Sequence, residues 1–95
     1  TKALAVEGGP QKILVNAINP GPTRTERYDS INTHLADLWD VPLKEVEQRR
    51  LQDNPLSRPC EPEEVAALAV FLVSARAAYI NGVIMELDGG STRCI

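Results

Sequence analysis

Two short apolar runs, set far apart in the sequence, constrain the fold of this chain more than any other feature. The first covers residues 13–18 and is broken only by Asn16, and the second covers residues 83–87. Nearly continuous apolar runs of this length are typical of strands that are buried on both faces of a parallel sheet. A strand, helical connections and a second parallel strand form a βαβ unit, whose crossover we expect to be right-handed.

Helix signals fill the sequence around these runs. Residues 1–7 are rich in Ala, Leu, Lys and Glu, which favour helix, and the Gly-Gly-Pro segment at 8–10 ends the pattern. An amphipathic pattern over 30–53 predicts two further helices. We expect Ser30 to cap the first of them and Pro42 to open the second.

The segment 62–74 gives the strongest helix signal. Pro62 suits a first helical position, and glutamates at 61, 63 and 64 place negative charge where the helix dipole favours it. The segment is apolar on every side, which predicts burial on more than one side. Because two parallel strands are not a stable sheet, we expect either further strands upstream of Thr1 or assembly with copies of the chain.

Length and composition exclude several classes of protein. The 95 residues suffice for one small domain, and 43% hydrophobic with 24% charged residues is ordinary for a globular protein. The net charge of −3 and the lack of a basic stripe argue against nucleic acid as a partner, and no apolar run is long enough for a membrane span. Cys60 and Cys94 lack metal-ligand spacing, so we expect no metal site. Reduced thiols in a cytoplasm are a simpler interpretation than one disulfide between them.

Three segments share a pattern with a known family: VNAINPGPTRT at 15–25, PEEVAALAVFLVS at 62–74 and INGVIMELDGG at 80–90. In that order and at that spacing, they closely resemble the C-terminal part of short-chain dehydrogenases/reductases. The resemblance implies that residues 1–95 are the C-terminal part of a single NAD(P)-binding domain of α/β class. They would hold the last two strands plus helices of a Rossmann-like, doubly wound parallel sheet. It also implies that residues 26–54 form the substrate-lid region.

The resemblance further implies a partial binding site for NAD or NADP in the loop after the first strand, which we expect to be irregular. The Pro20-Gly21 backbone would line the nicotinamide. The main chain near Pro22 and Thr23 would address the carboxamide, and the Thr25 hydroxyl would bond the carboxamide or a phosphate. A plainer alternative stays open, in which the Pro-Gly-Pro segment forms only a rigid turn and both threonines are exposed.

By the same resemblance, this chain contains no catalytic residue. The family's glycine-rich phosphate turn, its Ser and its Tyr-x-x-x-Lys pair would lie upstream of Thr1. Tyr28 and Tyr79 are not followed four residues later by Lys, so neither matches the family's catalytic Tyr. His34 is the only histidine, and we expect it to face solvent or belong to the lid. The 95 residues alone should therefore be inactive.

The implied activity transfers hydride between the nicotinamide and a small carbonyl or secondary-alcohol substrate. An alternative is a non-catalytic assembly module. Family members commonly pack their last helix and strand across a twofold axis, so we expect a homodimer or homotetramer through helix 62–74 and strand 83–87. The apolar helix fits that use, because its exposure would leave a sizeable apolar patch.

Four further features have both a functional and a plainer interpretation. Arg24 and Arg27 could meet a cofactor phosphate or an acidic substrate, but we favour a solvated surface for both. Trp39 could line a substrate pocket, although packing within the lid is the more ordinary use. Asn16 needs a hydrogen-bond partner once buried, and we expect a structural bond to a neighbouring loop. Residues 88–90, Asp-Gly-Gly, predict a turn with positive φ and no chemistry.

Overall fold

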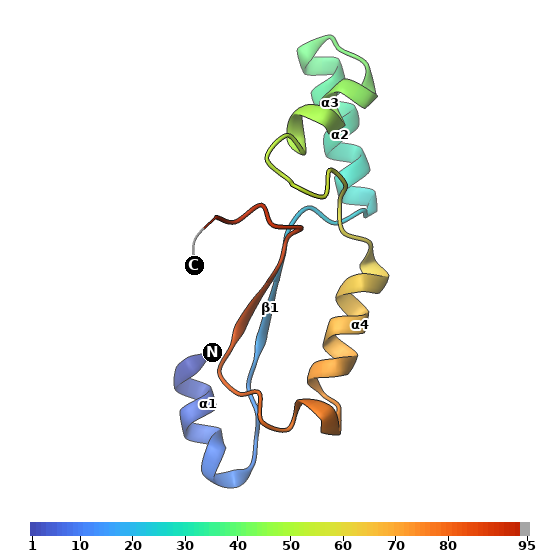
Figure 1. Cartoon of the computed structure of the whole chain (residues 1–95). Coiled ribbons are helices and arrows are strands. Elements are labelled where there is room, and N and C mark those ends of the chain that lie inside the picture. The colour runs from blue at the N-terminus through green and yellow to red at the C-terminus, as the bar shows by residue number, and fades with distance from the viewer. Residues whose placement is uncertain (94–95) are drawn as a thin grey trace.

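The structure is a computed structural model that describes residues 1–93, and its parallel strands lie side by side at the centre (Figure 1). The elements are α1 (Lys2–Gly8), η1 (Gly9–Gln11), β1 (Ala17–Pro20), α2 (Glu26–Trp39), α3 (Leu43–Arg50), α4 (Pro62–Leu72), η2 (Ala75–Ala77) and β2 (Ile84–Leu87). Strands β1 and β2 pair in parallel, with Ala17 opposite Ile84 and Pro20 opposite Leu87. The predicted α/β class, with two parallel strands joined by helices, is confirmed.

The chain is elongated, with principal extents of 56 × 26 × 20 Å. In the view of Figure 1, α1 and α4 flank the two strands. Helices α2 and α3 pack against each other and project beyond the carboxyl ends of the strands. We refer to residues 26–50 as the α2–α3 hairpin. Two segments connect the hairpin to the strands and to α4, namely residues 21–25 and residues 51–61.

Strand β1 begins later than the apolar run predicts. The run starts at residue 13, but ladder pairing starts at Ala17. Ahead of that point an amide side chain replaces the strand partner, because the Val15 N–H donates to Asn81 Oδ1 at 2.9 Å. Pro20 is the last residue of the strand, and the following Gly21 N–H donates to the Leu87 carbonyl at 2.9 Å.

Asn16 has the structural partners that its position predicts. Its Nδ2 donates to the Ile80 carbonyl at 3.0 Å, and its Oδ1 accepts from the Val83 N–H at 3.2 Å. A buried amide that used only one of these atoms would leave a polar group without a partner. The side chain therefore joins the start of β1 to the loop before β2, as expected.

The expectation that both strands are buried on two faces is wrong for this chain taken by itself. Residues of β1 are half-buried or exposed, and Ile84 in β2 has 62% of its surface exposed. The described elements explain the difference, because α4 is the one long helix that runs beside the strands. Most of the buried apolar volume lies instead in or next to the hairpin, at Tyr28, Val46 and Leu51.

The segment predicted to form a lid contains two helices as expected, but the first starts earlier. Helix α2 begins at Glu26 rather than at Ser30, because Thr25 acts as its N-cap and its Oγ1 accepts the Tyr28 N–H at 3.2 Å. Asp40, with a φ of 52°, ends α2 in the left-handed region. Pro42 then precedes α3, as the sequence pattern indicates.

The predicted start of α4 is confirmed, and its predicted burial is not observed. Glu61 and Glu64 form a capping box at its N-terminus, each side chain accepting a main-chain N–H of the other residue. The helix ends at Leu72, two residues before the predicted end. Val70 has 67% and Phe71 has 40% of its surface exposed, because no described element covers this side of the helix.

Candidate functional site

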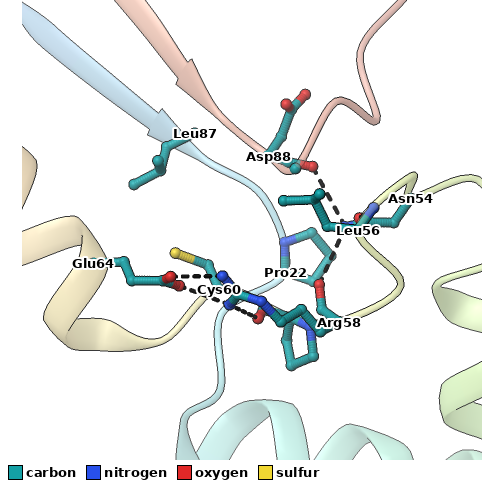
Figure 2. A pocket seen from close by; sticks show the side chains of 10 residues that line it. Pro22, Asn54, Leu56, Arg58, Cys60, Glu64, Leu87 and Asp88 are labelled. Carbon is teal, nitrogen blue, oxygen red and sulfur yellow. Dashed lines mark hydrogen bonds and ion pairs between the residues drawn. The ribbon is translucent and has the colours of Figure 1, made fainter.

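The carboxyl ends of the two strands lie at one edge of the sheet, since the strands are parallel. Figure 2 shows this region, where the loop after β1 meets the turn after β2. A small cavity of about 150 Å³ lies there. Its walls come from Pro22, Asn54, Leu56, residues 58–60, Glu64 and residues 87–89. In α/β folds, ligands bind at this edge of the sheet, so it is the candidate site.

Pro20 and Gly21 occupy the point where the strand becomes the loop. Pro20 pairs with Leu87 as the last register position. A Cβ atom added to Gly21 would lie 3.0 Å from both Cα and Cβ of Asp88. The close approach of the two strand ends therefore favours glycine at this position, which is a structural reason independent of any ligand.

The segment from Pro22 to Arg24 belongs to no helix or strand, but two main-chain hydrogen bonds hold it in place. The Cys60 N–H donates to the Pro22 carbonyl, and the Arg24 N–H donates to the Cys60 carbonyl, both at 2.8 Å. These two bonds make a parallel bridge between Thr23 and Cys60. In such a bridge the main-chain groups of Thr23 point away from Cys60. The predicted irregular stretch over residues 20–27 is thus confirmed for 21–25, apart from this isolated bridge, whereas Pro20 still belongs to β1 and residues 26–27 already belong to α2.

The two threonines differ in what they leave available for a ligand. The Thr23 hydroxyl donates to the Gly21 carbonyl at 2.9 Å, so its proton is used within the loop. The Thr23 N–H takes part in none of the hydrogen bonds among residues 1–93. The Thr25 hydroxyl accepts the Tyr28 N–H, so its own proton remains available. The loop thus presents one main-chain and one hydroxyl donor.

Of the five residues predicted to bind cofactor, Pro22 alone lines the small cavity. The other four, Pro20, Gly21, Thr23 and Thr25, lie next to it along the same loop. Whether these residues bind a cofactor stays a prediction.

Asn54 is a site residue that sequence reasoning missed. It is buried, and its Nδ2 donates to the carbonyls of Arg58 and Asp88, at 3.3 and 3.4 Å. Its Oδ1 accepts the Leu56 N–H at 2.9 Å. The Asn-Pro dipeptide at 54–55 predicts a turn, but not the bond to Asp88 across the cavity (Figure 2).

An ion pair forms another wall of the cavity. The Arg58 guanidinium donates two hydrogen bonds to the Glu64 carboxylate, at 2.8 and 2.6 Å (Figure 2). These bonds, together with the N–H of Glu61, lower the pKa of Glu64 to about 2. Cys60 lies beside this pair, and burial raises the pKa of its thiol, so the thiolate is disfavoured at neutral pH.

The turn after β2 agrees with its prediction. Gly89 and Gly90 have φ values of 64° and 87°, which favour glycine. The N–H groups of Gly90 and Thr92 donate to the Asp88 carboxylate at 3.0 and 2.8 Å. Hydrogen bonding to Thr92, with a smaller contribution from Gly90, lowers the pKa of Asp88.

The other side chains considered as catalytic or substrate-binding candidates lie outside the cavity. Tyr28 is buried in the hairpin, where its hydroxyl donates to Glu47 Oε1 at 3.2 Å. Burial raises the pKa of Tyr28, so its proton is held more tightly than usual. Tyr79 and His34 are exposed. Trp39, at the end of α2, has the Arg49 guanidinium 5.6 Å above its ring, which is contact within the hairpin.

The structure also bears on cysteine, metal and membrane chemistry. Within residues 1–93, Cys60 forms no disulfide, and Cys94, its conceivable partner, lies outside the described residues. No group of three or more His, Cys, Asp or Glu side chains in the described part of the chain is arranged to hold a metal ion. Each helix that the structure describes is too short or too polar to cross a bilayer.

Comparisons with known proteins agree with the geometry. Residues 1–92 match the family described as enoyl-(acyl carrier protein) reductase. The protein MoaE of Klebsiella aerogenes is 38% identical over 91 residues, which cover 96% of this chain and 35% of that protein. The NADPH-dependent reductase BacG of Bacillus subtilis is 34% identical over 95 residues, which cover 100% of this chain and 37% of that protein.

Solved structures give the same result. A short-chain dehydrogenase family protein of Francisella tularensis superposes with a TM-score of 0.92 at 30% identity, over 99% of this chain and 39% of that one. The L-sorbose reductase of Gluconobacter frateurii, solved with NADPH and L-sorbose, superposes with a TM-score of 0.89 at 34% identity. That match covers 99% of this chain and 36% of the reductase. The chain thus spans little more than a third of the length of these proteins, and it belongs to the short-chain dehydrogenase/reductase family.

Proposed function

We propose that this chain is one part of an NAD(P)-dependent oxidoreductase, within a single NAD(P)-binding domain. Hydride would pass between the nicotinamide and a small carbonyl or secondary-alcohol substrate. Family membership supports this, as do relatives described as NADPH-dependent reductases or solved with NADPH. Because the chain spans 37% of one such relative, the catalytic groups would lie in the remainder of the protein.

The single observation that carries the proposal is the loop at the carboxyl end of β1. It lies at the edge where α/β folds bind ligands, and two main-chain hydrogen bonds with Cys60 fix its position. The unused Thr23 N–H and the Thr25 hydroxyl proton suit the oxygen atoms of a carboxamide or a phosphate. These two donors therefore fit a nicotinamide cofactor, whereas the Thr23 hydroxyl does not, because Gly21 already accepts its proton. When bound, the cofactor supplies or accepts the hydride.

Residues 26–54 serve as the substrate lid in this proposal. The hairpin has its own buried residues and projects beyond the strand ends, next to the loop that would hold the nicotinamide. A body with its own core keeps its shape while closing over a substrate, so it orients the substrate and excludes water.

Intact mass and turnover test the proposal. Mass spectrometry of the protein, freshly purified from cells that carry the full gene, should give a value well above 10.4 kDa. That protein should consume NADPH or NADH with a carbonyl substrate, whereas residues 1–95 alone should not. A mass of 10.4 kDa, or a longer protein without nicotinamide-dependent turnover on a panel of carbonyls and alcohols, would contradict the proposal.

A second proposal concerns assembly and rests on a different observation. Val70 and Phe71 on α4 and Ile84 on β2 are exposed in the described chain. Exposed apolar surface of this kind marks an interface. We propose that these elements pack against a second copy, in a homodimer or homotetramer, whether or not the protein is an enzyme. We also propose a cytoplasmic location, supported by the sparse use of cysteine.

A further inference from the structure

Arg24 stands between the two threonines of the candidate cofactor loop and bonds to three other parts of the chain. Its main-chain N–H donates to the Cys60 carbonyl at 2.8 Å. Its Nε lies 3.2 Å from Glu61 Oε1, at the N-terminus of α4. Its Nη2 lies 3.4 Å from Glu47 Oε1, on α3. One side chain thus joins the loop, the hairpin and α4.

Aromatic contact adds to these bonds. The Arg24 guanidinium lies 5.9 Å from the centre of the Tyr28 ring, and the Arg50 guanidinium lies 4.9 Å from the same centre. The Tyr28 hydroxyl donates to Glu47 Oε1, the oxygen that Arg24 also contacts. The Arg24 side chain stays 45% exposed, as the predicted solvated surface implies, and its head group also contacts two carboxylates and a ring.

The position of Arg24 matters because the hairpin is attached at this place. The segments 21–25 and 51–61 pair with each other through the bridge between Thr23 and Cys60. The Arg24 side chain contacts α3 through Glu47 and the N-terminus of α4 through Glu61. A movement of the hairpin that separated Glu47 from Glu61 would strain or break one of the two ion pairs that Arg24 forms with them. Such a movement would therefore also displace the main chain of the loop.

We propose that Arg24 is a positioning residue for cofactor binding. It holds the Thr23 N–H and the Thr25 hydroxyl in place by anchoring their loop to Glu47 and Glu61, and it links the position of the hairpin to that of the loop. The inference rests on the proposed function, because it assumes that the loop holds a nicotinamide cofactor. Arg24 acts through the two glutamates and does not itself meet a cofactor phosphate.

The distribution of charge separates these two roles. If Arg24 bound a phosphate directly, Glu47 and Glu61 would compete for the guanidinium and repel the phosphate, so their removal would tighten cofactor binding. If Arg24 positions the loop through them, their removal weakens binding in the same way as removal of Arg24. Arg27 provides a matched control, because it is exposed and forms no ion pair within residues 1–93.

The test uses the full-length protein and NADPH or NADH alone, with binding followed by nicotinamide fluorescence. We expect R24Q and E47Q each to raise the Kd for cofactor by about twofold to fivefold, as suits partly exposed ion pairs. The double variant R24Q/E47Q should have a Kd for cofactor no higher than that of whichever single variant binds less tightly. The reason is that both substitutions break the same ion pair. R24K should restore part of the loss, and R27Q should bind as the wild type does. E61Q repeats the comparison at the other carboxylate.

Each remaining outcome overturns a stated claim. Unchanged cofactor affinity in folded R24Q, with folding checked by circular dichroism, overturns the positioning role. Weaker binding in R24Q with tighter binding in E47Q and E61Q overturns it in favour of direct phosphate contact. Equal loss in R24Q and R27Q indicates a general charge effect and also overturns it. If the wild type binds neither NADPH nor NADH, the proposed function fails, and this inference fails with it.

Discussion

Asn54 and Gly89 fit each other closely at the residue scale. A Cβ atom added to Gly89 would lie 2.7 Å from Asn54 Oδ1, and the φ of 64° already disfavours any side chain there. The amide of Asn54 in turn depends on the Asp88 carbonyl at the same turn. Glycine after Asp88 is therefore what lets the segment after the hairpin dock on the end of β2.

Replacing Gly89 by Ala should destabilise the protein through both effects. Alanine in the left-handed backbone region and displacement of the Asn54 side-chain amide should together lower the free energy of unfolding by about 1–3 kcal/mol. Urea unfolding measures the change. Gly9→Ala is the control, because Gly9 has a helical φ of −52° and an added Cβ would lie 4.0 Å from Asn81 Nδ2, an ordinary contact. The control should be neutral or stabilising by up to about 1 kcal/mol, and equal losses in both variants would contradict the argument.

Glu64 predicts a pH dependence of stability. Its pKa is about 2 in the folded chain against an ordinary 4.5, so the unfolded chain binds the proton more readily. The ion pair with Arg58 therefore contributes stability above pH 4.5, and this contribution is lost as the pH falls towards 2. In E64Q, stability at neutral pH should be lower, and the acid-induced loss across this range should be smaller.

Thermal unfolding across that pH range checks the prediction. E63Q is the matched control, because Glu63 stands in the same helical turn without an ion pair among the described residues. E63Q should follow the wild-type pH profile. A parallel loss of stability on acidification in the wild type and E64Q would show that the Glu64 pair contributes nothing.

Residue-level predictions succeeded where local chemistry was sufficient. The partner of Asn16 follows from the rule that buried amides need hydrogen bonds, and the turn at 88–90 follows from its glycines. The roles of Asn54 and Arg24 could not be predicted, because each bonds to residues that are distant in sequence. No periodicity or spacing indicates which carboxylate an exposed arginine will meet.

At the scale of the element, Thr25 connects the stability of α2 to the candidate site. T25A removes the cap on the Tyr28 N–H and should lower the free energy of unfolding by about 1 kcal/mol. T25S keeps a hydroxyl and should restore most of that loss. Chemical unfolding of the three proteins measures it. If T25A and T25S are equally stable, the hydroxyl does not cap the helix.

Helices were predicted better than strands for a physical reason. The start of α4 is marked by Pro62 and adjacent glutamates, signals that act within one turn of helix. The start of β1 depends instead on Asn81, which lies 66 residues away from Val15 and takes its N–H. The start of α2 was placed too late because Thr25 and Ser30 are both good caps, and sequence alone does not choose between them.

At the scale of the whole molecule, the exposed side of α4 predicts assembly. V70D places a charge on this apolar side, where 67% of the valine surface is exposed in the described chain. If a second copy covers it, the substitution should weaken association by about tenfold to a hundredfold, which is about 1.4–2.8 kcal/mol. Analytical ultracentrifugation of the full-length protein measures the dissociation constant.

L38D is the matched control, because Leu38 is 68% exposed but lies on the hairpin. It should leave the oligomeric state unchanged. A monomeric wild-type protein at micromolar concentration, or equal effects of the two substitutions, would contradict an interface on α4.

The family and the α/β class could be predicted from sequence, because three motifs in order carry them. The location of the core could not. Apolar strands indicate what a complete sheet would bury, whereas the described chain buries most of its apolar volume near Tyr28 and Val46. The hydropathy of a segment predicts that it is buried, but it does not identify the element that covers it.

The hairpin encloses its own buried residues and is joined to the rest of the chain by two neighbouring segments that pair with each other. Recombination can exchange such a unit between related genes as one piece. Recombination between relatives with crossover points near residues 25 and 54 would exchange the whole hairpin together with the buried Leu51 that packs next to it. An incoming hairpin with an acid at position 47 would keep the ion pair with the resident Arg24.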